Sequence, residues 1–427
     1  MELHQIHQLF LESSGVSTDT RSIKQDSLFF ALKGVNFNGN TFAYQALEKG
    51  ARYAIVDEVQ HSSNDRFVLV ADVLETLQAL AHFHRNYLGL PIIALTGSNG
   101  KTTTKELIHA VLKPHFTTAA TVGNLNNHIG VPLTLLSMTT ETEIGIVEMG
   151  ANHAKEIAFL CEIAQPNMGY ITNFGKAHLE GFGSEEGVVK AKSELYDHLK
   201  ENSGLIILNS EEPKQVAQVG DYDSVYTFSE SLKTNVNVKL TTVQPFLTVS
   251  INNTEIQTHL VGMYNFHNIA AALAIGTYFK LTPLQLNNGI EAYIPANNRS
   301  QIIQQHSNEI LLDAYNANPS SMEVALENFK GIQNQHKLAV LGDMFELGAT
   351  SAKEHLAVVN QAILTKNCSF YFVGTHFFQQ KIAHPKLRFF ETFKDLKAHL
   401  DKTTISNTSI LIKGSRGMAL ERVLELI

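Results

Sequence analysis

The chain has 427 residues, 44% hydrophobic and 17% charged, with a formal net charge of −8. This length predicts about two to four domains, each able to bury its own core, and the composition excludes a disordered chain. The negative charge, without a dense Lys/Arg run, predicts no nucleic-acid partner, so an anionic substrate would have to meet local basic residues.

Targeting and redox features point to the cytoplasm. The first residues, M-E-L-H-Q, lack the basic and apolar regions of a secretory signal, and no apolar run reaches the roughly 20 residues of a membrane span. The two cysteines, Cys161 and Cys368, lie far apart in apolar segments and predict buried thiols instead of a disulfide framework. We therefore expect a cytoplasmic protein without membrane insertion.

Short apolar runs alternate with segments of helical period along the chain, a pattern typical of parallel α/β sheets. In residues 1–89 the expected strands are Leu28–Leu32, Tyr53–Val56 and Phe67–Val70. A helix follows at Val73–Tyr87, because Gly89-Leu90-Pro91 would stop it. This region predicts a small N-terminal α/β domain.

Residues 90–296 predict a central sheet domain. Its buried strands are expected at Ile92–Leu95, Ile144–Glu148, Gly169–Thr172 and Leu205–Asn209. Residues 246–251 and 255–261 alternate in period two around Asn252-Asn253, which indicates a hairpin. A helix of small residues is expected at Asn265–Tyr278.

Residues 297–427 predict a third, Rossmann-like α/β domain after a linker at Tyr293–Asn298. Its expected strands are Ile310–Asp313, Leu338–Leu341, Phe370–Val373 and Ile410–Lys413. A helix should start near Pro319, with Ser320 and Glu323 spaced as a capping box.

The motif T-G-S-N-G-K-T-T at residues 96–103 lies between an expected buried strand and a helix. Glycines let a backbone curl around phosphates, and the helix start adds a positive dipole end. Lys101 can reach the β/γ-phosphates of ATP, and the Thr102 hydroxyl is placed for Mg²⁺. Leu95 stands where the general phosphate-loop pattern has its first glycine, so this is a narrower variant. The alternative is a glycine-rich turn that arose by chance.

Two further side chains follow strands at the edge where the phosphates should lie. Glu148 ends its strand, and His178 lies in the loop after the next one. Carboxylates suit Mg²⁺, and ligands gather at the carboxyl ends of parallel strands. Taken alone, Glu148 is equally consistent with a surface charge, and His178 fits an ordinary loop histidine better.

Together these segments resemble the Mur ligase family, cytoplasmic enzymes that build the peptide of the bacterial cell-wall precursor. The resemblance rests on T-G-S-N-G-K-T-T, on I-V-E-M-G-A at 146–151, on A-H-L-E-G-F-G-S at 177–184 and on A-K-S-E-L at 191–195. Within the family the chain is most similar to the enzymes that add D-alanyl-D-alanine to UDP-N-acetylmuramoyl-tripeptide. The strings that favour them are D-T-R at 19–21, N-L-N-N-H-I-G-V-P at 124–132, D-A-Y-N-A-N-P at 313–319 and K-G-S-R-G at 413–417.

The chain also departs from the family pattern. Leu312-Asp313 replaces a usual pair of aspartates, and Ala314 replaces a serine. Tyr264 stands where many relatives carry His, and Asn38-Gly39-Asn40 replaces a common D-G-H. These changes fall in the nucleotide and uridine pockets and leave the phosphate loop and the expected metal ligands intact.

The resemblance implies ATP-dependent amide-bond formation through an acyl phosphate, with two Mg²⁺ ions. Its catalytic residues would be Lys101, Glu148, His178 and Lys192. Thr102 and Glu148 would hold the first ion. Glu148, His178 and a carbamylated Lys192 would hold the second. From the sequence alone, Lys192 would be an ordinary solvated helix lysine.

The resemblance also implies the substrate contacts. ATP would meet the phosphate loop, which comprises Thr96, Gly97, Ser98, Asn99, Gly100, Lys101 and Thr102, and also Asn265, Asn268, Arg299 and Asp313. Asp19, Thr20 and Arg21 would contact the uridine nucleotide, Asn126 and Asn127 the muramoyl-peptide, and Asn316, Ser415 and Arg416 the dipeptide. Asparagine amides satisfied within a domain interface, and a solvated Arg416, are the alternatives. The family also suggests a monomer.

Two rival functions remain. The chain could be a sister ligase or a folylpolyglutamate-type ligase that adds a single amino acid, or a catalytically inactive ATP-binding regulatory protein. The N-L-N-N and Y-N-A-N-P strings argue against the first, and the retained Lys101, Thr102, Glu148, His178 and Lys192 argue against the second.

Sites spread over three domains predict that the outer domains close over the central loop before reaction. Without ligands, we expect Arg416 to lie too far from Lys101 for one substrate to touch both.

Overall fold

The structure is a computed structural model that describes residues 1–62, 64–296 and 298–427. It contains three separate β-sheets and one two-stranded ribbon, with helices between the strands, so the predicted three-domain α/β architecture is confirmed. The expected boundaries, 89/90 and 296/297, remain predictions. The second boundary, with its linker, includes Asn297, which lies outside the described residues.

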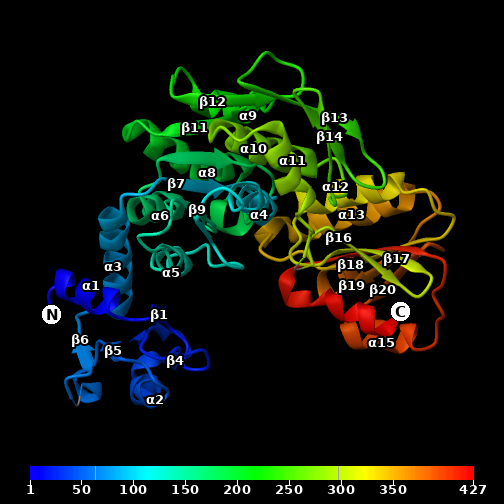
Figure 1. Cartoon of the computed structure of the whole chain (residues 1–427). Helices are drawn as coiled ribbons and strands as arrows, with labels where there is room; N and C mark the ends of the chain where they lie inside the picture. Colours follow the sequence, from blue (N-terminus) through cyan, green and yellow to red (C-terminus); the bar gives the residue numbers. More distant parts are fainter. Residues whose placement is uncertain (63, 297) are drawn as a thin grey trace.

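The first sheet is parallel, in the order β1-β2-β5-β6. Its strands are β1 (Val16–Ser17), β2 (Leu28–Phe30), β5 (Tyr53–Val56) and β6 (Phe67–Leu69), and the ribbon consists of β3 (Lys33–Gly34) and β4 (Phe37–Asn38). The helices are α1 (Leu3–Leu11), α2 (Ala43–Glu48) and α3 (Val73–Leu88). Gly89, at φ 62°, ends α3 as expected. This long helix joins the first region to the centre of the molecule (Figure 1).

The second sheet has nine strands in the order β15-β14-β13-β12-β11-β10-β7-β9-β8. Their bounds are β7 (Ile92–Thr96), β8 (Thr118–Ala120), β9 (Ile144–Glu148), β10 (Met168–Ile171), β11 (Leu205–Asn209), β12 (Val225–Ser229), β13 (Val236–Thr242), β14 (Thr248–Ile251) and β15 (Thr254–Gln257). Strands β7 to β13 pair in parallel, and β14 and β15 form the predicted antiparallel hairpin. Asn252 and Asn253 both have positive φ, as a two-residue turn requires.

Helices cover the second sheet. They are α4 (Lys101–Leu112), α5 (Gly130–Leu135), α6 (Glu156–Ala164), α7 (Leu179–Phe182), α8 (Glu185–Glu201), α9 (Pro213–Val219), α10 (Asn265–Tyr278) and α11 (Pro283–Glu291). Strand β7 lies between β9 and β10 and is buried over its whole length. Its carboxyl end, where the phosphate loop begins, therefore lies beside the carboxyl ends of its two neighbours.

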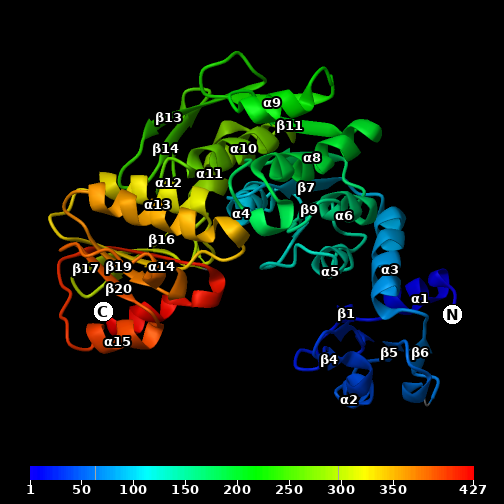
Figure 2. The same ribbon diagram turned by 180° about the vertical axis from the view of Figure 1, so that it is seen from behind.

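The third sheet has the order β16-β17-β21-β18-β19-β20. Its strands are β16 (Gln301–Gln305), β17 (Asn308–Asp313), β18 (Lys337–Gly342), β19 (Ser369–Val373), β20 (Leu387–Phe390) and β21 (Ser409–Lys413), and its helices are α12 (Pro319–Gly331), α13 (Ser351–Leu364), α14 (Thr375–Gln379) and α15 (Phe393–Leu400). Only the β16–β17 pair in this sheet is antiparallel. Figures 1 and 2 show this region and the first region on opposite sides of the central one.

The predicted capping box of α12 is wrong. Asn318, not Ser320, is the N-cap: it has an extended backbone, and its side chain accepts a hydrogen bond from the Ser321 N–H. Pro319 takes the first helical position, where its missing N–H is harmless. Ser320 is then already inside the helix, and its hydroxyl is available for another contact.

Candidate functional site

The phosphate loop connects β7 to α4 in a conformation that its glycines make possible. Gly97 has φ 142°, and a Cβ there would lie 2.0 Å from the Thr172 hydroxyl. Gly100 has φ 79° and forms the N-cap of α4. The N–H groups of Ser98 and Asn99 donate to the Asn173 carbonyl at 3.0 Å and to its side-chain Oδ1 at 3.1 Å. The loop is thus held open by the neighbouring strand end before any ligand arrives.

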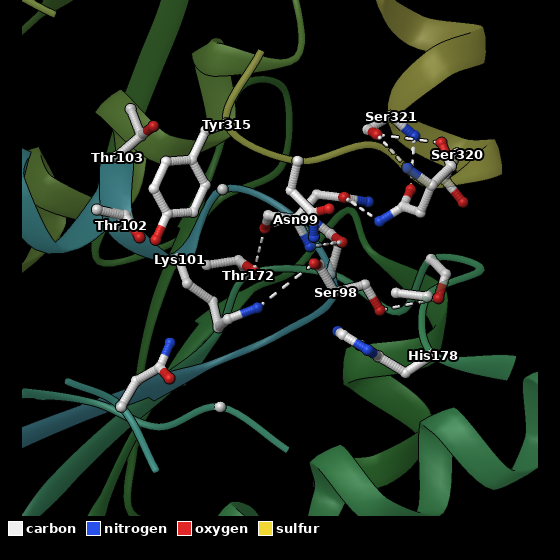
Figure 3. Close-up of a pocket in the computed structure, with 18 of the residues that line it drawn as sticks. Ser98, Asn99, Lys101, Thr102, Thr103, Thr172, His178, Tyr315, Ser320 and Ser321 are labelled. Atoms are coloured by element: carbon white, nitrogen blue, oxygen red, sulfur yellow. Dashed lines mark hydrogen bonds between the residues drawn. The ribbon is translucent and has the colours of Figure 1, made fainter. Parts of the chain in front are cut away.

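Lys101 points back into its own loop. Its Nζ donates to the Gly97 carbonyl at 2.7 Å and to the Ser98 carbonyl at 3.4 Å (Figure 3). Burial lowers the pKa of Lys101, and the charge of Arg299 lowers it further, whereas Glu148 opposes the shift. A phosphate that replaced the two carbonyls would supply the compensating charge that the ammonium now lacks.

Glu148 is 1% exposed at the end of β9. Its Oε1 accepts a hydrogen bond from the Asn126 amide at 2.8 Å, whereas its buried Oε2 has no hydrogen-bond partner among the described residues. A buried carboxylate oxygen without a donor is costly, so a cation or donor is expected there.

Mg²⁺ fits this position on chemical grounds. The carboxylate of Glu148 and the hydroxyl of Thr102 are both hard oxygen donors, which this ion prefers. Within the described ranges, no group of three or more His, Cys, Asp or Glu side chains is arranged to hold a metal by itself. An ion here would therefore depend on phosphate oxygens for the rest of its shell, as Mg²⁺ at nucleotide sites usually does.

His178 faces the same cleft, and its partner comes from the third region. Its backbone is left-handed at φ 52°, and its Nδ1 pairs with the Glu346 carboxylate. Burial is the main cause that lowers the pKa of His178. Glu346 was not identified from the sequence, because this contact joins distant parts of the chain and has no local signal.

Lys192 lies on α8 behind the cleft wall. It is 1% exposed, its Nζ donates to the Ala151 carbonyl at 3.2 Å, and the ring of Phe182 lies 5.1 Å from it. Burial lowers the pKa of Lys192 well below its usual value, and the charge of Lys101 adds to the shift. The lysine is therefore not the solvated helix residue that the sequence alone favours.

Asn265 and Asn268 occupy one face of α10, as their spacing predicts. The Asn268 amide donates to Asn265 Oδ1 at 2.9 Å, and its own Oδ1 accepts from the Thr104 hydroxyl at 3.1 Å. Both side chains are buried. These contacts link α10 to α4, so the two amides support the phosphate loop whether or not they touch the nucleotide.

A cluster of charges from the third region completes the cleft. The guanidinium of Arg299 lies 3.6 Å from the ring centre of Tyr315, and that of Arg416 lies 5.7 Å from it. Asp313 is paired with the buried Lys413 at 2.6 Å. Tyr315 and Lys413 were not predicted as site residues, although both lie in strings that carry the resemblance.

The third region touches the phosphate loop directly. Asn318 Nδ2 donates to Asn99 Oδ1 at 2.7 Å, and the Lys176 N–H donates to the Ser320 hydroxyl at 2.7 Å. In the view of Figure 3, Asn99 lies between Thr102 and the start of α12. No sequence signal marked these contacts, because each joins residues far apart in the chain.

Most of these groups line one cleft of about 990 Å³. The predicted residues that line it are Ser98, Asn99, Gly100, Lys101, Thr102, Asn126, Asn127, Glu148, His178, Asn265, Asn268, Arg299, Asp313, Asn316, Ser415 and Arg416. Those that do not are Thr96, Gly97, Lys192, Asp19, Thr20 and Arg21. Arg416 and Lys101 line the same cleft, whereas the expected separation, too large for one substrate to touch both, stays a prediction.

The three N-terminal residues lie elsewhere. Arg21 forms an exposed ion pair with Asp19 at 2.6 Å, and Lys49 Nζ donates to the Thr20 carbonyl at 2.8 Å. Among the described residues, none before Ser98 lines the cleft. The structure therefore brings most of the predicted nucleotide residues and all of the predicted muramoyl-peptide and dipeptide residues to one cleft, and the predicted uridine residues lie outside it.

Three family descriptions match successive parts of the chain. They are "Mur ligase family, catalytic domain" at residues 12–87, "Mur ligase middle domain" at residues 95–276, and "Mur ligase, glutamate ligase domain" at residues 298–416. Among the described residues, no helix is long and apolar enough to cross a membrane.

Characterised proteins are similar over nearly the whole length. The UDP-N-acetylmuramoyl-tripeptide–D-alanyl-D-alanine ligase of Bacillus subtilis is 36% identical, covering 96% of this chain and 92% of its own. A MurF crystal structure from Acinetobacter baumannii superposes with a TM-score of 0.83 at 29% identity, covering 98% of this chain and 97% of its own. The Thermotoga maritima MurF ligase in complex with ADP gives 0.85 at 26% identity, with the same coverage of both chains.

Proposed function

This chain belongs to the Mur ligase family, and we propose that it joins D-alanyl-D-alanine to UDP-N-acetylmuramoyl-tripeptide with ATP as the energy source. The observation that carries the proposal is the shared cleft, which brings the phosphate loop of the central region together with Ser415 and Arg416 of the third region. The products besides the amide are ADP and phosphate.

The chemistry starts from a poor electrophile. The terminal carboxylate of the tripeptide takes the γ-phosphoryl group of ATP to give an acyl phosphate. The D-alanyl-D-alanine amine attacks its carbonyl carbon, and phosphate leaves. Lys101 and the N-terminus of α4 hold the transferring phosphates, because both present positive charge to them.

Metal ions complete the charge balance. Two Mg²⁺ ions, when bound, would screen the repulsion between the triphosphate and the substrate carboxylate. Thr102 and Glu148 would hold the first ion, and Glu148, His178 and Lys192 the second. The buried, unpartnered Oε2 of Glu148 supports the first assignment.

Lys192 must change chemically to join this set, because an ammonium has no lone pair to donate. Its depressed pKa favours the neutral amine, which attacks CO₂ to form a C–N bond and releases one proton, leaving a carbamate. The carbamate carries two hard oxygen donors. Lys192 would then reach toward the cleft past Ala151, whose carbonyl it now binds.

Substrate contacts follow the three regions. Asp19, Thr20 and Arg21 bind the uridine nucleotide, Asn126 and Asn127 the muramoyl-peptide, and Asn265, Asn268, Arg299 and Asp313 the ATP. Asn316, Ser415 and Arg416 bind the dipeptide. The 59% exposed Arg416 side chain is paired with Glu421 at 3.0 Å and can turn its guanidinium fork to a carboxylate.

The domain assignments are residues 1–89 for the uridine substrate, 90–296 for ATP and 297–427 for the dipeptide. We also propose that the chain works as a monomer in the cytoplasm. The similarity to Mur ligases over nearly the whole chain supports both proposals.

Phosphate release tests the proposal. Purified protein is given ATP, Mg²⁺ and the UDP-tripeptide, with or without D-alanyl-D-alanine, and we expect release only with the dipeptide. Release with a single amino acid in its place would indicate a sister or folylpolyglutamate-type ligase. No release with any acceptor, despite ATP binding, would indicate an inactive regulatory protein.

A further inference from the structure

Lys105 is a fully buried lysine to which the proposed chemistry assigns no role. It lies on α4, one turn beyond Lys101, and has no exposed surface. Its Nζ donates to the Thr121 carbonyl at 2.5 Å and lies 2.9 Å from Glu106 Oε1. A buried ammonium is destabilising unless it is well paired, and an apolar side chain of similar length would fill the same space. The hydrogen bond from Lys105 to the Thr121 carbonyl therefore points to a role beyond filling space.

Thr121 connects this lysine to Glu148. It follows β8, and its own N–H donates to the Ile146 carbonyl at 2.9 Å. Its hydroxyl accepts the Glu148 N–H at 3.0 Å. Thr121 is 2% exposed, so bulk water has little access to its contacts with Lys105 and Glu148. The backbone of Glu148 is thus held through Thr121, and Thr121 is held through Lys105.

The connection spans the two elements that carry the expected ligands of the first ion. Thr102 lies three residues before Lys105 on α4, and Glu148 ends β9. A hydrogen-bonded path therefore runs from α4 through Thr121 to the backbone of Glu148, and it ties the helix that carries the Thr102 hydroxyl to the strand that carries the Glu148 carboxylate. Mg²⁺ needs near-ideal octahedral geometry and tolerates little change in ligand spacing.

We propose that Lys105, acting through Thr121, is a positioning residue that sets the spacing of Thr102 and Glu148 for Mg²⁺. The inference rests on the proposed function, which places the ion between these two side chains. It predicts a defect in Mg²⁺-dependent nucleotide binding and no defect in nucleotide binding without the ion.

The test measures binding of a fluorescent ADP analogue, in Mg²⁺ and in EDTA, to wild type and to Lys105→Met. We expect equal affinity in EDTA. In Mg²⁺ the variant should lose about 10-fold in affinity, the size of effect seen when groups that orient metal ligands are removed. Lys113→Met is the matched control, because Lys113 is exposed at the end of the same helix. It should behave as wild type in both conditions.

Thr121 provides a second route if Lys105→Met does not fold. Thr121→Val keeps the shape but removes the acceptor for the Glu148 N–H, and should show the same Mg²⁺-specific loss. Thr121→Ser keeps the hydroxyl and should restore the wild-type response, which a purely packing role of the threonine would not predict.

The measurements separate a failure of the proposed ion site from a failure of the positioning role alone. If wild type binds the analogue equally well in Mg²⁺ and in EDTA, the proposed ion site is wrong, and this inference fails with it. If wild type responds to Mg²⁺ and both Lys105→Met and Thr121→Val respond equally, the positioning role alone is overturned. Equal losses in Mg²⁺ and EDTA would also overturn it, because they would show general damage to α4.

Discussion

Lys101 holds contacts that a bound substrate must replace. Its ammonium is hydrogen-bonded to the Gly97 and Ser98 carbonyls, so ATP binding exchanges two neutral acceptors for anionic ones. Lys101→Ala removes the charge expected to follow the transferring phosphoryl group. We expect turnover to fall about 100- to 1000-fold, the loss typical for one preorganised charge-stabilising group.

The fold should survive the Lys101→Ala change, because the side chain is only half-buried and packs on its own loop. Circular dichroism melting checks this point, and phosphate release gives the rate. A Lys101→Ala enzyme that turned over within a few-fold of wild type would contradict the phosphate-loop role.

Substitution of Lys192 tests the proposed carbamate directly, because a replacement that keeps the positive charge cannot form a carbamate. Lys192→Ala should lose most activity, and a small carboxylic acid added to the assay should restore part of it by filling the gap. Lys192→Arg should stay inactive, since it keeps a charge but cannot form a carbamate. Lys190→Ala, at an exposed position on the same helix, should matter little.

Two results would refute the carbamate. The first is full activity in Lys192→Ala. The second is a crystal structure of the metal-loaded complex in which Lys192 is a bare ammonium, still hydrogen-bonded to the Ala151 carbonyl as it is here.

At the scale of elements, a buried histidine pair joins α1 to α3. His7 Nε2 lies 3.0 Å from His84 Nδ1, and His84 Nε2 lies 2.9 Å from the Met138 carbonyl. A carbonyl only accepts, so His84 Nε2 carries the proton and His84 Nδ1 accepts from His7. Burial lowers the pKa of both rings, which disfavours the charged form of each ring in the folded state.

This pair predicts acid destabilisation. A histidine whose folded pKa is depressed binds more protons unfolded, so its contribution is fully present above about pH 6.5 and is lost as the pH falls toward the folded pKa. The slope is at most about 1.4 kcal/mol per pH unit for each histidine. His7→Gln keeps an N–H donor but does not titrate, so its Tm should fall less than that of wild type between about pH 7.5 and pH 5.5.

The matched control is His4→Gln, an exposed position on the same helix, whose Tm should follow wild type across this range. Identical pH slopes for His7→Gln and wild type would show that the pair does not titrate on unfolding.

Local patterns predicted the elements whose signals are contiguous. Strands β9 and β11 and helix α10 have the predicted bounds, because apolar runs and helical period are local. Strands β12, β13 and β16 were not predicted, because they carry many polar residues and are only partly buried. The prediction of the α12 N-cap was wrong because two capping patterns overlap, one starting at Asn318 and one at Ser320. The extended backbone of Asn318 decides between them.

The candidate site divides in the same way. The phosphate loop is one continuous segment, so its glycines, Lys101 and Thr102 could be identified directly. Glu346 and Ser320 could not, since each acquires its partner only when the third region packs against the centre. Burial of Lys192 likewise depends on tertiary packing, whereas the helix sequence around it predicts a solvent-exposed lysine.

At the scale of the whole molecule, the two outer regions differ. The third region contacts the phosphate loop through Asn318 and the loop after β10 through Ser320. The first region carries Asp19, Thr20 and Arg21 outside the cleft and is joined to the centre through α3 (Figure 1, Figure 2). If Asp19, Thr20 and Arg21 bind the uridine end of the substrate, as proposed, we expect the first region to move inward when the other end is phosphorylated in the cleft.

Small-angle X-ray scattering can test this difference between the two outer regions. ADP with Mg²⁺ should leave the radius of gyration nearly unchanged, because the third region already contacts the loop that binds it. The UDP-tripeptide should lower the radius, because it ties Asp19, Thr20 and Arg21 to the central cleft. Arg21→Ala should need more UDP-tripeptide for the same compaction, since the guanidinium of Arg21, exposed and paired with Asp19, is the group expected to meet the diphosphate. Compaction by ADP alone would show that the third region moves instead, and scattering unchanged by both ligands would show that neither outer region closes.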